Sequence, residues 1–196
     1  MSESESAGRQ GWTEIGFYRP AEKLVYDALW DRFDEKFDLR PSGGRPAQVI
    51  RDPSPSVTFD LSRWHSGPEW AIAAASVQAE TIEVLVSTFP EVEVFYVLDW
   101  QHPAYELRPA IEFAESEPFD LSSNYPSVYP NGDYYAYLTP DFGQGTFGNP
   151  WEPSLCVFGE QIIESLGRSL ATWMPVLRTV GAEGWEGLRP PNPMSD

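Results

Sequence analysis

Residues 129–159 constrain the fold of this chain more than any other stretch, because turn residues, aromatic residues and apolar runs follow one another there in a clear order. Turn residues at 130–132 precede an apolar, aromatic run at 134–138. A glycine-rich segment at 143–148 then leads into a second apolar run at 154–158. Short β-prone runs bounded by turn residues predict strands. We expect residues 134–138 and 154–158 to be neighbouring antiparallel strands joined by a glycine-rich loop.

Helices are predicted from apolar residues that recur with the helical period. In residues 20–37 they fall at i, i+3, i+4, i+7 and i+11 and form one stripe: Tyr26, Leu29, Trp30, Phe33 and Phe37. Pro20 suits the first turn of this helix, and Pro41 lies beyond its end. Residues 80–89 and the segment after Gly159 also have helical spacing, whereas residues 71–77 fit either a buried strand or a helix.

Further strands are predicted at 93–98 and at 105–107, and an alternating, half-buried strand is predicted at 57–61. Residues 176–180 are predicted as a last element of unspecified type. These strands do not alternate regularly with the helices, which argues against a doubly wound parallel sheet. We therefore expect one α+β domain, with a mainly antiparallel sheet covered by helices. That domain should span residues 12–183, between a disordered tail at 1–11 and a C-terminal tail at 184–196, with an irregular acidic stretch at 111–128.

The charge of the chain is strongly negative, with 30 Asp and Glu against 13 Lys and Arg and a net charge of −17. Residues 51–150 contain fifteen acidic and three basic residues, a net charge of −12. Nucleic acids and anionic membranes bind through basic groups, so we expect neither as a partner. A negative field attracts a basic protein or a cationic ligand, and it also keeps a protein soluble.

Cysteine usage and the terminal sequence bear on the compartment. Cys156 is a single cysteine and forms no internal disulfide, and its apolar neighbours predict a buried, unreactive thiol. The N-terminal residues lack the basic and apolar regions of a signal peptide. No apolar run reaches the length of about 18 residues that spans a membrane. We therefore expect a cytoplasmic protein.

Cofactor and metal motifs are weak in this sequence. Gly143, Gly145 and Gly148 match the pattern G-x-G-x-x-G. That pattern binds dinucleotides only where it opens a helix, and here Asn149, Pro150 and a strand follow. Two histidines and one cysteine are too few for a zinc site built from Cys and His. We expect no cofactor and no metal.

Carboxylates near the strand ends leave two kinds of chemistry open. Asp99 and His102 follow a strand, where they are well placed for acid–base catalysis, although a lone His is often a hydrogen-bonded structural residue. Paired carboxylates cleave glycosides or hold a hard cation, and the candidates are Asp99, Asp133, Asp141 and Glu152. Roles in local turns and on the surface explain the same residues better, because nothing in their spacing specifies a site.

Six short strings together resemble an uncharacterised bacterial family, a domain of unknown function found mostly in actinobacteria. They are WDRF (30–33), SVTFDL (56–61), DWQHP (99–103), PNGDYY (130–135), GTFGNPWE (145–152) and LCVFG (155–159). The resemblance covers roughly residues 26–170 and implies no established activity. The turn–strand–loop pattern and the acidity also resemble small bacterial immunity proteins, which neutralise toxins by covering their active sites.

We expect a binding protein rather than an enzyme, with a basic protein as its partner, as for an immunity protein. The binding surface would consist of Asp99, Trp100, His102, Asp133, Tyr135, Asp141 and Trp151. Charge would set the association rate, and Trp and Tyr would supply the hot spots. Two alternatives remain: a hydrolase that uses Asp99 with His102 or paired carboxylates, and an aromatic, acidic pocket for a cationic small molecule.

Overall fold

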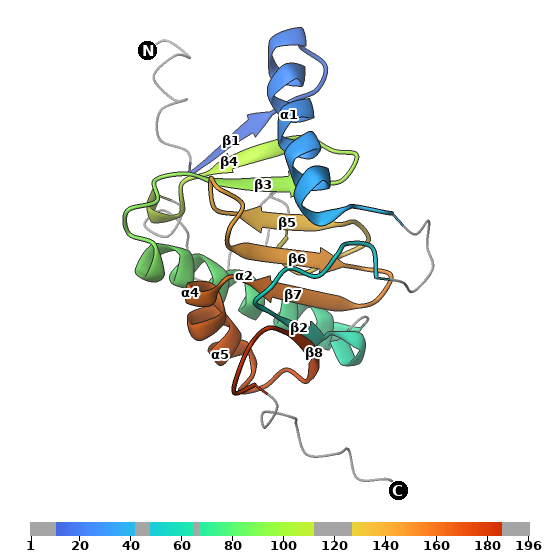
Figure 1. Cartoon of the computed structure of the whole chain (residues 1–196), viewed down its shortest axis with the longest axis vertical. Helices are drawn as coiled ribbons and strands as arrows, with labels where there is room; N and C mark the ends of the chain where they lie inside the picture. The colour runs from blue at the N-terminus through green and yellow to red at the C-terminus, as the bar shows by residue number, and fades with distance from the viewer. Residues whose placement is uncertain (1–10, 42–47, 65–66, 112–126, 186–196) are drawn as a thin grey trace, which may run out of the picture.

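The central feature of the fold is an antiparallel sheet (Figure 1). The computed structural model describes residues 11–41, 48–64, 67–111 and 127–185. Within these residues eight strands pair in the order β1-β4-β3-β5-β6-β7-β2-β8, and every neighbouring pair is antiparallel. The strands are β1 (Trp12–Ile15), β2 (Ser56–Asp60), β3 (Phe95–Asp99), β4 (Ala104–Leu107), β5 (Tyr135–Leu138), β6 (Gly145–Asn149), β7 (Ser154–Phe158) and β8 (Val176–Val180).

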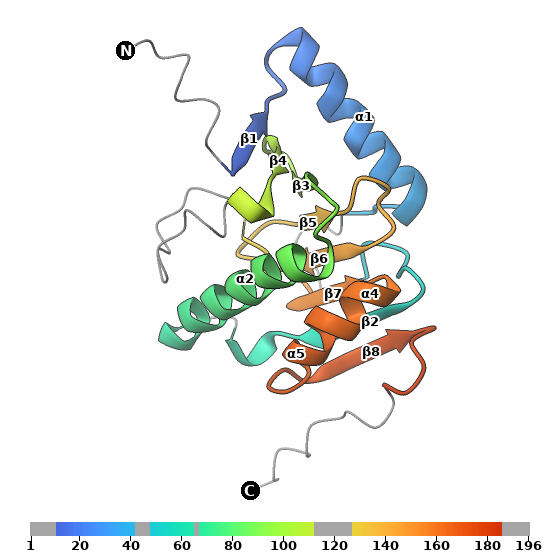
Figure 2. The same ribbon diagram turned by 90° about the vertical axis from the view of Figure 1, so that its left-hand side faces the viewer.

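Helices cover both faces of this sheet, which confirms the predicted α+β domain (Figures 1 and 2). On one face lies α1 (Pro20–Phe37); on the other lie α2 (Pro68–Thr88) and a helical stretch made of α4 (Glu160–Ile162), the π-helical turn η3 (Ile163–Gly167) and α5 (Arg168–Leu170). A 3-10 turn, η2 (Ser62–Trp64), follows β2. No helix in the described ranges is long and apolar enough to cross a membrane.

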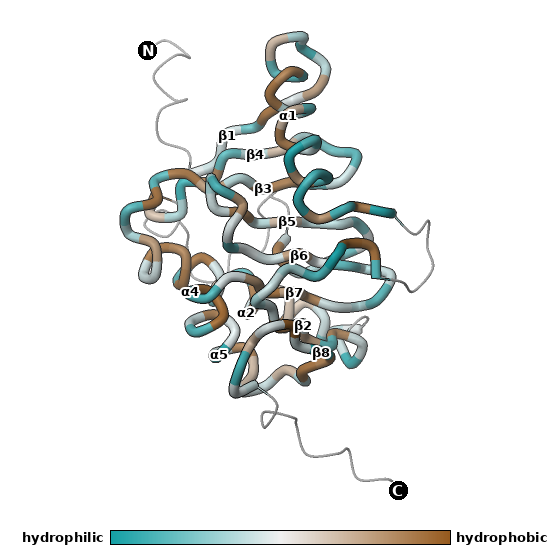
Figure 3. Tube along the Cα trace, viewed as in Figure 1, coloured by the Kyte–Doolittle hydropathy of each residue, from teal (hydrophilic) through white to brown (hydrophobic). Residues whose placement is uncertain are grey.

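Helix α1 has the predicted bounds and the predicted buried stripe. Leu29, Phe33 and Phe37 are buried against the sheet, and the Phe33 ring stacks on that of Phe147 with centroids 5.8 Å apart. Hydrophilic (teal) and hydrophobic (brown) stretches both occur along the tube of this helix (Figure 3), as an apolar stripe at the helical spacing produces. Asp38 takes a left-handed conformation, φ 51°, and ends the helix.

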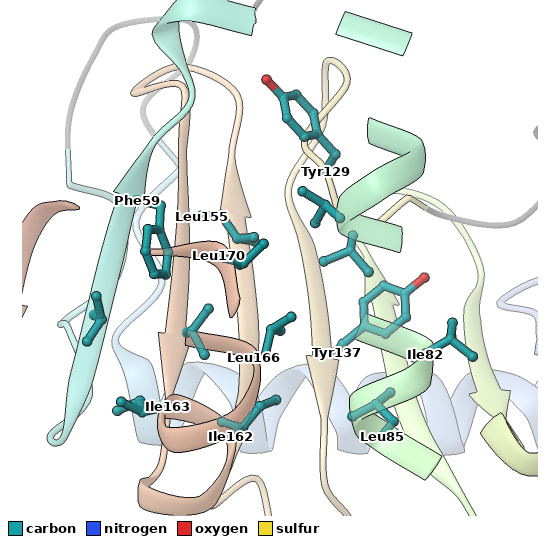
Figure 4. Close-up of a cluster of buried hydrophobic side chains, with 14 of the residues drawn as sticks. Phe59, Ile82, Leu85, Tyr129, Tyr137, Leu155, Ile162, Ile163, Leu166 and Leu170 are labelled. Carbon is teal, nitrogen blue, oxygen red and sulfur yellow. The ribbon is translucent and has the colours of Figure 1, made fainter. Parts of the chain in front are cut away.

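The opposite face of the sheet packs on the other helices, as Figure 4 shows. Phe59, Tyr137 and Leu155 point from β2, β5 and β7 into this layer. They meet apolar side chains of α2 and of the 160–170 helical stretch: Ile82, Leu85, Ile162, Ile163, Leu166 and Leu170. Because both faces are covered, the strands between β3 and β2 have buried residues at nearly every position.

Residues 71–77 have a sequence pattern that fits either a strand or a helix. In the structure they belong to the single long helix α2. The buried residues of α2 recur with helical spacing at Ala73, Val77, Thr81, Ile82 and Leu85. The predicted helix at 80–89 is the C-terminal half of the same element. Most predicted strands lie within one or two residues of the observed ones.

The predicted pairing of 134–138 with 154–158 is wrong. Part of the expected glycine-rich loop, Gly145 to Asn149, is strand β6, and it lies between β5 and β7. β5 and β7 are both antiparallel to β6 and therefore run parallel to each other. The glycines serve close packing: a Cβ on Gly145 would collide with the carbonyl oxygen of Tyr137, and one on Gly148 would lie 3.1 Å from Pro130.

Three smaller expectations also change. β2 is buried on both faces, not half-buried, because Thr58 and Ser56 are covered as fully as Val57 and Phe59. β1 was not predicted; it is a short edge strand on β4. Trp185, expected in the C-terminal tail, is only 1% exposed in the core, so the packed part of the chain extends beyond residue 183.

The expected disordered residues 1–10, most of the irregular stretch at 111–128 and residues 186–196 of the expected C-terminal tail lie outside the described residues.

Replacing Gly145 by Ala tests the close approach of β6 to β5. We expect the free energy of unfolding to fall by about 3 kcal/mol, because the added methyl group meets backbone that cannot rotate away. Gly16→Ala is the matched control, since its methyl group meets mainly the flexible end of the Glu22 side chain. Chemical denaturation measures both variants. A similar small loss for the two variants would show that β6 tolerates a side chain at residue 145.

Candidate functional site

The turn after β3 brings a histidine back over the last residue of the strand. The backbone N–H of His102 donates to the carbonyl oxygen of Asp99 over 3.2 Å, and Gln101 takes a left-handed conformation, φ 67°. The turn is held to the neighbouring segment by the Trp100 N–H, which donates to the Tyr134 carbonyl over 3.1 Å. This geometry places the His102 Nδ1 atom 3.0 Å from the Asp99 Oδ1 atom.

A second carboxylate reaches the same imidazole from the turn before β5. Asp99 pairs with Tyr135 in the β3–β5 register, so the residues that precede Tyr135 lie beside the β3 turn. Asp133 Oδ2 lies 3.4 Å from His102 Nδ1, and Asp133 Oδ1 accepts the N–H of Tyr134 over 3.0 Å. We call Asp99, His102 and Asp133 the acidic cluster. Its residues are buried, exposed and partly exposed, respectively.

Burial governs the electrostatics of the acidic cluster. It raises the pKa of Asp99 to about 6, although the hydrogen bond with His102 opposes the shift. The hydrogen bond to Asp99 raises the pKa of His102, and burial raises that of Asp133. The imidazole between the two carboxylates therefore favours its protonated form. All three pKa values are raised, and the titrations of the three groups are coupled.

Three tyrosines surround Asp99 in addition to the acidic cluster. Burial raises the pKa of Tyr26, Tyr105 and Tyr135, and the charge of Asp99 adds to each shift. Tyr26 comes from α1, Tyr105 from β4 and Tyr135 from β5. The Tyr135 hydroxyl donates to Asn131 Oδ1 over 2.5 Å, so this predicted binding residue braces the turn and is only 8% exposed.

The remaining predicted residues divide between the two ends of the sheet. Trp100 lies in the cluster turn, half-buried, with its ring edge-to-face to that of Tyr134. Trp151 follows the last residue of β6. Because β6 is antiparallel to β5, this position lies at the same end of the sheet as the start of β5, and Trp151 is 38% exposed there. Asp141 lies at the opposite end of β5, in the turn to β6. Its carboxylate accepts from the Thr139 hydroxyl over 2.6 Å and from the Gly143 N–H over 2.9 Å, which gives it a role in the turn.

Glu152 and Cys156 both have structural roles away from the acidic cluster. Arg178 Nη1 donates to Glu152 over 2.9 Å, while its Nε donates to Asp52 over 2.7 Å, so Glu152 belongs to a partly buried ion pair. Cys156 is buried on β7, and burial raises the pKa of its thiol to about 12. The thiol is therefore protonated at neutral pH and unreactive, as its apolar neighbours predict.

The acidic cluster can perform three kinds of chemistry. It can bind a cationic group, because two carboxylates converge on one point. It can also hold a divalent cation, since one ligand atom from each of its residues lies within 4.8 Å of the others. Finally, Asp99 orients the exposed imidazole of His102, the arrangement that a general base requires. The expectation that the protein binds no metal rests on the scarcity of Cys and His for a zinc site. That expectation stays a prediction.

The sequence predicts one binding surface that includes Asp99, His102 and Asp133, and these three residues lie together in the structure. It does not predict Tyr26 or Tyr105 as part of that neighbourhood. Tyr26 was assigned to the apolar stripe of α1, which is correct, since it packs partly against that core. No spacing in the sequence connects α1 with β4 and the β3 turn. The packing of the strand ends against α1 produces that neighbourhood.

Fold and site thus define an α+β protein with an acidic cluster at one end of an antiparallel sheet. The chain belongs to a family described as "Protein of unknown function (DUF2716)", which matches residues 22–163. This confirms the resemblance to a domain of unknown function. The chain is similar to "Uncharacterized protein YxiI" of Bacillus subtilis (strain 168), with 29% identity over 154 residues, 76% of this chain and 91% of the Bacillus protein. No solved structure gives a significant match.

The raised pKa values predict how the stability of the protein depends on pH. Because Asp99 binds its proton more tightly in the folded protein, its contribution to stability is full below pH about 4 and is lost as pH rises through about 6. The raised pKa of His102 acts in the same direction. We expect the difference in unfolding free energy between Asp99→Asn and the wild type to move in favour of the variant between pH 4 and pH 7.

Asp141→Asn serves as a control of opposite sign. The hydrogen bond from Thr139 lowers the pKa of Asp141, so that carboxylate stabilises the protein above its unfolded pKa and the stabilisation is lost in acid. Denaturation follows Asp99→Asn between pH 4 and pH 7, and Asp141→Asn from pH 7 down to below the unfolded Asp pKa of about 4, where its trend appears. A difference for Asp99→Asn that does not change with pH would contradict the burial of a charged group at this position.

Proposed function

We propose that the acidic cluster binds a basic group of a partner protein, and that the protein acts as an immunity-type protein that covers a basic surface. The observation that carries the proposal is the position of His102. Its Nδ1 atom lies 3.0 Å from Asp99 and 3.4 Å from Asp133. The protein thus already holds one cationic group of its own between these carboxylates.

This internal cation supports a site that accepts an external one. The His102 side chain is 57% exposed, so it can turn away when a Lys or Arg of a partner approaches. Asp99 is largely shielded from water, which strengthens its attraction for an arriving guanidinium or ammonium group. Arginine suits such a site best, because it pairs with carboxylates in a bidentate manner.

An apolar neighbourhood supports a protein partner. An aromatic row leads from solvent toward Asp99: the ring centroids of Tyr18 and Phe17 are 4.4 Å apart, and those of Phe17 and Tyr26 are 5.3 Å apart. Tyr18 is 85% exposed, and Leu24 on α1 is 74% exposed. Protein interfaces combine aromatic anchors with charged groups at the rim in this way.

The overall charge supports the sign of the partner. Residues 51–150, with a net charge of −12, include both carboxylates of the acidic cluster. A negative field accelerates encounter with a basic protein, and the acceleration weakens as salt screens the charges. A basic protein encoded beside the gene for this chain is the first partner to test.

The Asp99–His102 pair supports a hydrolase as a second candidate. Asp99 would orient the imidazole, and the exposed ring would take a proton from water. The variant His102→Gln separates the two functions: general-base catalysis needs the imidazole, whereas cation binding needs only the two carboxylates. Ester or glycoside hydrolysis by the wild type that is lost in His102→Gln would favour the hydrolase, whereas binding of a basic partner that is unchanged in this variant would favour the binding function.

The binding proposal is tested by titrating an arginine-rich peptide into the protein and following affinity by calorimetry. We expect the double variant Asp99→Asn with Asp133→Asn to bind about tenfold more weakly at low salt, a loss of about 1.4 kcal/mol. At about 0.3 M salt the difference should shrink, because the remaining attraction is screened.

The matched control is Asp31→Asn with Glu35→Gln, which removes the same charge from exposed positions of α1. This control should weaken binding less than about twofold, as expected for surface charges. Equal losses in the two double variants would mean that the peptide responds to net charge alone, and the acidic cluster would not be the site.

A further inference from the structure

A groove on the other helical face of the protein has no part in the acidic cluster. It lies between α2, η2 and the turn before β8, and its volume is about 400 Å³. Glu69, Ile72, Ser76 and Glu80 line it from α2, and two tryptophans, Trp64 and Trp173, line it from the turns. The four α2 residues recur at i, i+3, i+7 and i+11, so they form one stripe along the helix.

The aromatic wall of the groove is a pair of indole rings. Trp64 and Trp173 meet edge-to-face, with centroids 5.5 Å apart and an interplanar angle of 72°. The Arg63 guanidinium lies 5.5 Å from the centroid of the Trp64 ring, so the Trp64 ring already attracts a cation. Tryptophan is the strongest of the aromatic side chains in such interactions.

Glu80 supplies a fixed negative charge inside the groove. One carboxylate oxygen accepts the Ser169 hydroxyl over 2.6 Å, and the other accepts the Trp173 Nε1–H over 3.2 Å. Both donors are neutral, so they orient the carboxylate without cancelling its charge. In the part of the chain that the structure describes, neither Glu80 nor Glu69 forms an ion pair with a basic side chain.

The groove therefore combines three features that favour one ligand chemistry. Its aromatic rings attract a cation, its carboxylates form no ion pair with a basic side chain of the described residues, and Ile72, 69% exposed, offers apolar contact for an alkyl group. A carboxylate that accepts two hydrogen bonds keeps capacity for further donors or for a purely electrostatic partner. A metal ion would use the carboxylates but not the rings, whereas an organic ammonium ion would use both.

We propose that this groove binds a small organic ammonium ion, with its cationic head between Glu80 and the tryptophan rings and its alkyl part against Ile72. The site is separate from the acidic cluster and does not depend on the function proposed for that cluster. It gives the protein a second, small-molecule ligand of positive charge.

The test uses choline and its neutral isostere 3,3-dimethylbutan-1-ol, which have the same shape and differ in charge. Binding to the full chain is followed by NMR through the indole N–H signals of Trp64 and Trp173. We expect choline to shift both signals in a saturable manner and the neutral isostere to bind about tenfold more weakly.

Two variants and one control locate the effect. Glu80→Gln should weaken choline binding about tenfold, because the amide keeps an acceptor oxygen but loses the charge. Ser76→Phe should abolish binding by filling the groove without removing either carboxylate. Glu83→Gln removes an exposed charge one turn further along α2 and should change affinity less than about twofold.

Several outcomes would overturn the proposal. They are no saturable choline binding to the wild type, equal binding of choline and its neutral isostere, or an equal loss in Glu83→Gln and Glu80→Gln. Thermal melting of each variant shows whether it is folded. Because Glu80→Gln and Ser76→Phe disturb the groove in different ways, retention of full affinity in whichever of them folds also contradicts the site.

Discussion

Burial of the central strands on both faces is the constraint on which this structure depends. An antiparallel sheet often leaves one face to solvent, but here α1 and α2 lie on opposite faces and the strands between them have little polar surface. The glycines of β6 and the small side chains of β2 follow from this arrangement, because the interior must be filled at close to crystalline density. Charged residues are therefore displaced to the strand ends, where both candidate binding residues and structural carboxylates gather.

At the strand ends the same side-chain type takes different roles because its surroundings differ. Asp141 accepts two hydrogen bonds inside its own turn, and these lower its pKa. Asp99 lies at the end of a buried strand beside a second carboxylate, and its pKa is raised. Asp133 and Asp141 have similar sequence surroundings, since both follow turn residues. Only the three-dimensional neighbourhood separates a carboxylate that holds a turn from one that can receive a charged ligand.

Much of the fold could be predicted from local pattern. The apolar stripe of α1 gave its bounds, and the β-prone runs gave β3, β5 and β7 within one or two residues. β6 could not be predicted in this way, because Gly145 and Gly148 are typical of loops and their reason lies in contacts with Tyr137 and Pro130. Asp99, His102 and Asp133 were predicted to share one binding surface with Asp141, but Asp141 lies at the opposite end of β5. Tyr26 comes near Asp99, and Glu80 contacts Trp173, because distant segments of the chain pack together. No local sequence pattern predicts either of these contacts.

The strand order also determines how this chain must fold in time. β5, β6 and β7 are consecutive in sequence and in the sheet, so they can pair as soon as they are made. β2 is different: its neighbours are β7 and β8, and Ser56 pairs with Phe158 about one hundred residues later. During synthesis on the ribosome, β2 must wait unpaired until β7 has emerged, and its second edge must wait for β8. Completion of the sheet by such distant pairing is intrinsically slow, and it leaves the apolar residues of β2 exposed to chaperones and to aggregation in the meantime.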